Sequence, residues 1–202
     1  MPLKVNLLSQ RVAEALGIEN MKVPFIYSNH IKAFCRNVVP DSKPIYVVVQ
    51  PLPDKPINEC FNIVPEHILA HGGEQQFGWS IWHWPKVFVE AEFHSVWKCP
   101  DGTMVDITPK RISVDRILFL PDPHRHYEGR QVDNIRKPIS NDPLIKQFLA
   151  LAEERYRETN KGDLANQHGR VIVSARVGEI DHEMRKIGFF LAQKFGSPLA
   201  SH

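Results

Sequence analysis

Long apolar runs are missing from this sequence of 202 residues. A membrane-spanning helix needs roughly 20 consecutive apolar residues, and no stretch approaches that length. The first residues, Met1 to Asn6, also lack the apolar segment and the cleavage site of a signal peptide. Internal repeats and low-complexity tracts are absent too. We therefore expect a soluble globular protein with no membrane partner.

Cysteine and net charge are also scarce. Three cysteines, Cys35, Cys60 and Cys99, occur at unrelated spacings. An odd count argues against a disulfide framework and for a reducing compartment, the cytosol of the producing cell or of an infected host. The 25 Lys and Arg residues nearly balance 23 Asp and Glu residues, and they are scattered. Nucleic acid is therefore not expected as a partner, and the oligomeric state is left open.

What is present predicts an α+β fold, with helices before and after an antiparallel sheet, in a single domain over residues 1–202. Residues 1–42 are expected to be helical, 43–121 to form the core, 122–140 a loop, and 141–202 a helix-strand-helix segment. The expected helices are Leu7–Leu16, His30–Val38, one that starts near Asn58, Leu144–Tyr156 and Glu183–Phe195. The expected strands are Ile45–Gln50, Gln75–Trp84, Val87–Trp97, Thr103–Thr108, Arg116–Leu120 and Val171–Val177.

The clearest local signal is a hairpin turn at residues 98–103, Lys-Cys-Pro-Asp-Gly-Thr. Pro100 suits the first corner of a type I turn and Asp101 suits the second. Gly102 can take the left-handed conformation of a G1 bulge. These residues predict two antiparallel strands joined by a three-residue loop.

That loop fixes the register of the two strands. It pairs Cys99 with Thr103 and so places His94 opposite Thr108, with Asp106 as its diagonal neighbour. Side chains alternate across a strand, so His94 and Asp106 share one face. Diagonal neighbours lie roughly 7 to 8 Å apart at their backbones, within reach of these side chains. The carboxylate can then orient the imidazole as a general base.

Cys60 is the candidate nucleophile. Asn58 offers a side-chain oxygen as N-cap for a helix that carries Cys60 in its first turn, although Pro65 predicts a kink or a later start. The unpaired N–H groups of a first turn favour a thiolate and can hold an oxyanion. Asn58 or Gln50 can add a side-chain donor. If this helix start packs against the face of His94, the three residues form a Cys-His-Asp triad.

A family resemblance supports this arrangement. The stretch from His94 to Pro109, HSVWKCPDGTMVDITP, resembles the histidine-to-aspartate hairpin of transglutaminase-like enzymes, which follows a helix-start cysteine as in papain-like enzymes. The likeness covers residues 45–120, and the flank of Cys60 departs from the usual Gly-x-Cys pattern. It implies acyl transfer through a thioester. The substrate would be a protein or a small amide, cleaved by a peptidase, isopeptidase or deamidase without a cofactor.

Two groups of residues near the triad are candidates for substrate binding. Glu90 and Glu92 share the strand face of His94, where they would favour a neutral or cationic group. Buried acids need partners, so this face is either open or supplied with Lys and Arg. Trp82 and Trp84 can line a groove or belong to the core. Trp79 is expected in the core.

Three other interpretations are alternatives to the catalytic triad. Cys60 can be a small buried hydrophobe, as Cys35 and Cys99 are expected to be structural. The chain can be a binding module that keeps the fold and uses an aromatic groove. A metal-dependent hydrolase would need a carboxylate-histidine cluster, but His124 and His126 lie in a loop without a third ligand at a recognisable spacing. We therefore expect no metal site.

Overall fold

The computed structural model describes residues 21–161 and 174–196. They divide into two compact units, one of residues 23–83 and 89–128 and the other of the remaining described residues. Both helices and strands are present, so the α+β class is confirmed. Within the described ranges, no helix combines the length and apolar character that crossing a bilayer would demand.

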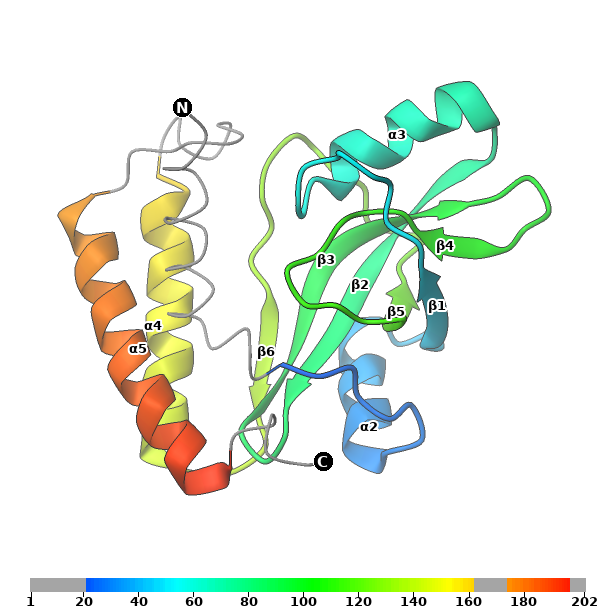
Figure 1. Ribbon diagram of the computed structural model, residues 1–202. Helices are drawn as coiled ribbons and strands as arrows, with labels where there is room; N and C mark the ends of the chain where they lie inside the picture. Colours follow the sequence, from blue (N-terminus) through cyan, green and yellow to red (C-terminus); the bar gives the residue numbers. More distant parts are fainter. Residues whose placement is uncertain (1–20, 162–173, 197–202) are drawn as a thin grey trace. The chain divides into compact units, whose positions relative to one another are not determined.

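The first unit is built on five strands that close on themselves (Figure 1). The order is β2-β5-β1-β4-β3, and β3 completes the ring by pairing with β2. Four successive side chains of β5, from Ile117 to Leu120, are fully buried, so this strand is covered on both faces. The strands are β1 (Ile45–Val49), β2 (Glu74–Trp84), β3 (Phe88–Lys98), β4 (Met104–Asp106) and β5 (Arg116–Pro121).

One pairing departs from the antiparallel sheet that the sequence predicts. Strands β1 and β4 run parallel, with Val48 opposite Val105 and Val49 opposite Asp106. A parallel pair needs a long crossover, and here the chain passes through a helix and the β2–β3 hairpin before it returns. Residue patterns within each strand do not encode this pairing. Its consequence is that Asp106 lies beside the end of β1.

The predicted hairpin register is confirmed. Trp97 pairs with Val105 and Lys98 pairs with Met104. The Cys99 N–H donates to the Thr103 carbonyl at 2.8 Å, and Gly102 has a φ of 87°. The turn therefore has the left-handed glycine that its sequence requires.

Helix α3 (Cys60–His71) covers one side of this unit (Figure 1). The helix begins at Cys60 and contains Pro65, so the later start is wrong. Asn58 is not its N-cap. It takes a φ of 62°, and Glu59 occupies the cap position without a side-chain cap bond. The buried face of α3 packs on the β3–β4 hairpin through Ile63, Val64, Ile107, Trp97 and Val105.

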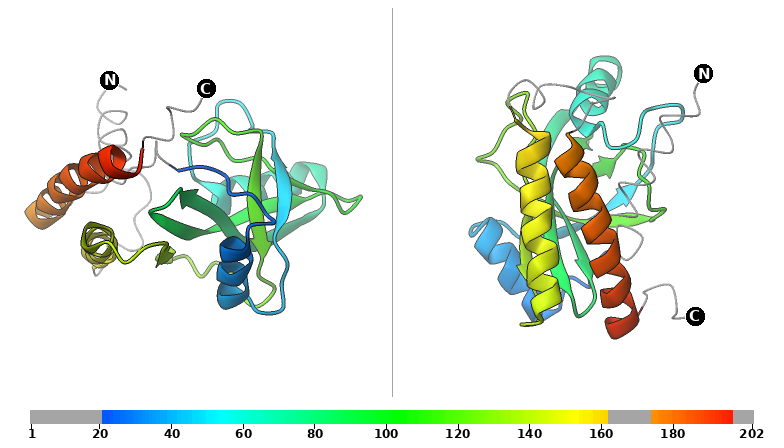
Figure 2. Two further views of the ribbon diagram at one scale, coloured as in Figure 1. Left: turned by 90° about the horizontal axis from the view of Figure 1, so that it is seen from below. Right: turned by 90° about the vertical axis from the view of Figure 1, so that its left-hand side faces the viewer.

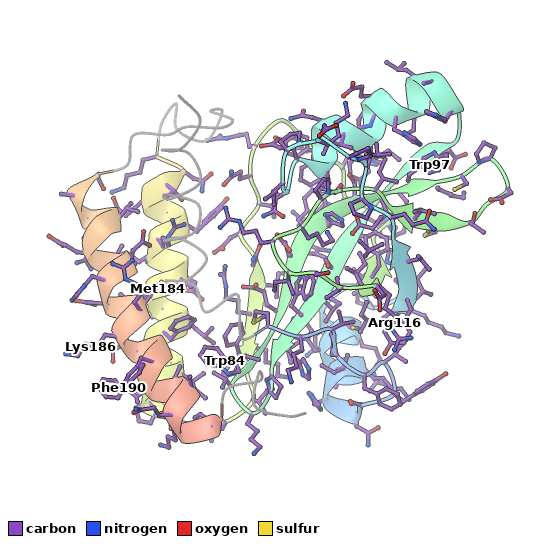
Figure 3. All side chains as sticks on the ribbon, viewed as in Figure 1. Trp84, Trp97, Arg116, Met184, Lys186 and Phe190 are labelled. Atoms are coloured by element: carbon purple, nitrogen blue, oxygen red, sulfur yellow. The ribbon has the colours of Figure 1, made fainter. Side chains whose placement is uncertain are left out.

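Helix α2 (Asn29–Val38) matches the second expected helix and buries Ile31, Phe34 and Cys35. The segment before it is tied to β1 by Tyr46, whose hydroxyl donates to the Pro24 carbonyl and accepts from the Ile26 N–H. The guanidinium of Arg116, labelled in Figure 3, lies 4.0 Å from the centre of the Tyr46 ring.

The second unit contains two long helices, α4 (Pro143–Thr159) and α5 (Ala175–Phe195), which lie side by side in Figures 1 and 2. Phe148 of α4 packs on Trp84 and Phe88, which close the turn between β2 and β3. On α5, Met184 is buried and Phe190 is 45% exposed (Figure 3). The predicted helices at Leu144–Tyr156 and Glu183–Phe195 lie within these two.

Two expectations in this region fail, and one lies outside the described residues. The expected strand Val171–Val177 is described only from Ser174, and Ala175–Val177 form the first turn of α5. The expected loop of residues 122–140 contains strand β6 (Ile135–Pro138). The helix expected at Leu7–Leu16 belongs to the residues that the structure does not describe.

Candidate functional site

A buried cluster of charges lies at the end of β4. His94 Nε2 is 3.0 Å from Asp106 Oδ2, as the hairpin register predicts. Lys110 donates to the same carboxylate oxygen at 2.8 Å, and its Nζ is 3.4 Å from His94 Nε2. The exposed fractions of the three side chains are 6%, 0% and 10%. One carboxylate therefore pairs with both an imidazole and an ammonium, away from water.

The electrostatics of this cluster favour a protonated histidine. Burial and the Lys110 ammonium lower the pKa of His94, but the Asp106 carboxylate and a thiolate at Cys60 outweigh them and raise it to about 9. Burial raises the pKa of Asp106, but His94 and Lys110 outweigh it and hold that pKa far below its usual range. An Asp106 anion and a His94 cation therefore coexist at neutral pH.

Cys60 is the first residue of α3, and it is buried. Its backbone carbonyl accepts a hydrogen bond from the Ser95 hydroxyl at 3.2 Å. Ser95 Oγ in turn accepts a hydrogen bond from Gln75 Nε2 at 3.0 Å. Ser95 and Trp97 contact α3, so the helix packs on the odd-numbered face of β3. His94 lies on the opposite face. The sequence made a triad conditional on α3 packing against the His94 face, and the body of the helix packs on the other face.

Cys60 nevertheless lies close enough to His94 for their charges to interact, since a thiolate at Cys60 raises the pKa of His94. The described residues contain no hydrogen bond between the Cys60 thiol and the imidazole. Just after the end of β4, the Asn58 N–H donates to the Pro109 carbonyl at 3.1 Å. That bond holds the chain two residues before Cys60 beside Lys110.

The two oxyanion candidates are held by their backbones. The Gln50 N–H donates to the Asp106 carbonyl at 2.9 Å, and both Gln50 and Asn58 are exposed. Their main-chain bonds fasten the segment before α3 along residues 106–109. No contact of either side chain with Cys60 is among the described interactions, so neither is placed as a donor.

Tyr127 is a group near Cys60 that sequence reasoning missed. Its ring stacks on Phe61, the residue after Cys60, with centroids 4.1 Å apart and planes 3° apart. Burial and the charges of Glu59 and Cys60 raise the pKa of its phenol. The phenol therefore shares the electrostatic surroundings of the thiol.

An aromatic cluster extends from Phe61 across the β2–β3 hairpin. Phe61 lies 5.2 Å from Phe93 and 6.3 Å from Phe77, measured between ring centres. Phe93 in turn lies 5.3 Å from Trp79. Phe61, Phe77 and Tyr127 are partly exposed, and Trp79 is buried as predicted. The cluster therefore offers a partly solvent-accessible apolar surface next to Cys60.

The predicted substrate-binding residues differ in their burial and in their partners. Trp84 is fully buried against Phe148, so of the two alternatives it belongs to the core and does not line a groove. Trp82 is also buried, and its Nε1 donates to Glu92 Oε2 at 3.1 Å. Glu92 thus meets an indole N–H where the sequence led us to expect an open face or a cation. Glu90 is half-buried and has a partner of its own.

The other cysteines and the histidine loop carry no comparable arrangement. Cys35 is buried, and burial raises the pKa of its thiol to about 11. Cys99 sits in the hairpin turn. His126 makes an edge contact with Phe77. Within the ranges that the structure describes, no three His, Cys, Asp or Glu side chains gather in a way that could hold a metal ion.

Lys110 is the second group that sequence reasoning missed. Its position four residues after Asp106 is a signal that could have found it, because Pro109 turns the chain directly after β4. Tyr127 left no such signal, since it comes from a loop far along the chain.

Comparisons with known proteins identify no relative. No protein-family model matches the chain, and neither the curated proteins nor the solved structures contain a similar one.

Proposed function

We propose that the protein is a cysteine-dependent hydrolase or amidotransferase that acts on an amide bond, with a transglutaminase-like or papain-like arrangement of Cys60, His94 and Asp106. The observation that carries the proposal is the buried His94–Asp106 pair, whose imidazole interacts electrostatically with the thiol at the start of α3. Perturbed ionisable groups that are buried together are typical of catalytic sites.

The protonation state of His94 suits thiol chemistry. A raised pKa at His94 favours an imidazolium, the form that can give a proton to a leaving group, and the nucleophile of thiol chemistry is the thiolate. The thiolate attacks the amide carbonyl, and His94 gives its proton to the leaving amine, which leaves a thioester on Cys60. Water or an acceptor amine then resolves the thioester. His94 takes up the proton of that nucleophile, and the thiolate returns.

Asp106 raises the pKa of the His94 imidazole, whereas Lys110 lowers it. Asp106 binds Nε2, which leaves Nδ1 as the nitrogen that would exchange a proton in the reaction, and it stabilises the imidazolium. Lys110 lowers the pKa of His94 and so limits how firmly the ring holds its proton. A general acid works best when its pKa lies near the working pH. The lysine therefore brings the histidine closer to that range.

Iodoacetamide labelling of each cysteine, followed against pH by peptide mass spectrometry, tests this proposal. Cys60 is expected to react faster than Cys35 and Cys99 at every pH tested. The buried Cys35 and the hairpin Cys99 are internal controls. His94→Ala should remove the fast reaction, whereas His126→Ala, which changes an exposed histidine of the same unit, should not. A Cys60 that labels no faster than Cys99 contradicts the proposal.

A non-catalytic binding module is the second candidate, and the partly exposed Phe61, Phe77 and Tyr127 favour it. In that case the aromatic cluster, and not the thiol, is the functional feature. This candidate predicts an unreactive Cys60 in the same experiment. A peptide or small amide that perturbs the Tyr127 signals without turnover would support it.

A further inference from the structure

Two histidines occupy one face at the C-terminal end of α3. His67 and His71 are four residues apart, and their rings stack with centroids 4.0 Å apart and planes 12° apart. Residues at this spacing are neighbours on a helix surface. His67 is half-buried and His71 is exposed. Neither takes part in the proposed acyl transfer.

The tautomer of His71 is set by the backbone. Its Nδ1 lies 3.1 Å from the His67 carbonyl oxygen. A carbonyl oxygen only accepts, so Nδ1 carries the hydrogen and donates it. In the neutral ring, Nε2 then keeps its lone pair. A histidine whose one nitrogen donates to a backbone carbonyl while the other is free is arranged as metal-binding histidines generally are.

Trp97 helps to hold the ring of His67 in place. Its Nε1 donates to the Gly72 carbonyl at 2.9 Å, and its indole makes an edge contact with His67 at 4.5 Å. The backbone packs tightly here, since a Cβ at Gly73 would lie 2.7 Å from that indole nitrogen and 2.3 Å from the Lys98 carbonyl oxygen. The position of His67 is therefore fixed from β3 as well as from its own helix.

The end of the helix favours a cation. His71 is the last residue of α3, where the helix carries a partial negative charge.

We propose that His67 and His71 form a two-nitrogen site for a divalent transition-metal ion of the kind that imidazole prefers, Zn²⁺, Ni²⁺ or Cu²⁺. Zinc-nitrogen bonds are about 2.0–2.1 Å long. An imidazole nitrogen binds a metal in the plane of its ring, so the stacked rings must turn about their side-chain bonds until both planes meet at the ion. Water fills the remaining positions. The described residues supply no cluster of three ligands, so the ion is exchangeable.

Metal titration of the full chain tests the site. Calorimetry with Zn²⁺ alone should show one ion bound, and electron paramagnetic resonance with Cu²⁺ should show two coordinated nitrogens. His71→Ala is expected to weaken binding by at least about 10-fold, the smaller loss found when even an outer-shell partner is removed. His124→Ala/His126→Ala, which removes the pair in the histidine loop, is the matched control and should bind as the original protein does.

The chain has ten histidines, so the difference between these variants decides the assignment. Because His71 is exposed, His71→Ala should leave the circular dichroism spectrum unchanged. Equal Zn²⁺ affinity in His71→Ala and in the original protein would overturn the proposal. So would a Cu²⁺ spectrum with one coordinated nitrogen. Neither result bears on Cys60, whose reactivity is measured separately.

Discussion

The charges around Asp106 and those between α4 and α5 involve the same kinds of group in different surroundings. Asp106 and Lys110 are 0% and 10% exposed, whereas Lys194 is 58% exposed, although the side chain of its partner Asp142 is 8% exposed. Exposed pairs contribute little to stability, and buried ones persist only while every partner is present. The comparison teaches that proximity of opposite charges identifies nothing by itself. Burial beside a thiol separates the candidate site from an ordinary ion pair.

Removing the shared carboxylate should have the largest effect. Asp106→Asn leaves Lys110 and the His94 imidazolium buried without their anion, which costs about 3–5 kcal/mol of unfolding free energy. Urea unfolding measures the loss. Asp181→Asn, which frees the partly buried Arg155 between α4 and α5, is the matched control and should lose clearly less. Equal losses would remove the distinction between the two regions.

The stability that His94 supplies should depend on pH. Its pKa in the folded protein, about 9, lies above the usual value of about 6.5, so folding favours the protonated ring. That contribution, of order 3 kcal/mol, is complete below pH 6.5 and disappears as the pH rises through 9. Urea unfolding from pH 6 to 10, compared between the original protein and His94→Asn, isolates it. Parallel pH profiles would contradict the expectation.

Lys110→Met should have a smaller effect, because Asp106 keeps His94 as a partner. We expect about 1–3 kcal/mol of lost stability, the usual result when one partner leaves a buried hydrogen bond. Since Lys110 lowers the pKa of both His94 and Asp106, both should rise. Nuclear magnetic resonance titration of the His94 ring follows this directly. A fall in the pKa of His94 would show that the lysine does not act as described.

The smallest effect is expected from a substitution of the exposed Lys194. Lys194→Ala should leave the midpoint of thermal unfolding nearly unchanged, because Lys194 is largely in water. Asp142→Ala should cost more, since the Asp142 carboxylate also accepts the Leu144 N–H at the start of α4. A large effect of Lys194→Ala would mean that exposed pairs in this protein behave as buried ones do.

Local chemistry made the hairpin predictable. The residues Pro100, Asp101 and Gly102 specify the turn, the turn specifies the register, and the register brings His94 to Asp106. Each step involves residues that are close in the sequence. The identity of the turn residues and the alternation of side chains along each strand were therefore sufficient to predict it. The same holds for α4, whose apolar residues recur at helical spacing.

Contacts between distant segments were not predictable in this way. The parallel pairing of β1 with β4, the packing of α3 on the odd face of β3, and the position of Tyr127 depend on how separate elements meet. Trp84 was left open between a groove and the core because an aromatic strand residue looks the same in both. Asn58 has the side chain of an N-cap, but its backbone takes a left-handed conformation that excludes that role.

The parallel β1–β4 pair also implies an order of events during folding. The hairpin of β3 and β4 can form early, since its strands are joined by a tight turn, and it brings His94 to Asp106. Pairing Val49 with Asp106 closes a loop that includes α3 and the whole β2–β3 hairpin, which is entropically slower. Only that closure fastens the segment before Cys60 along residues 106–109. A nascent chain would therefore assemble its His94–Asp106 pair before the segment that precedes α3 is fastened in place.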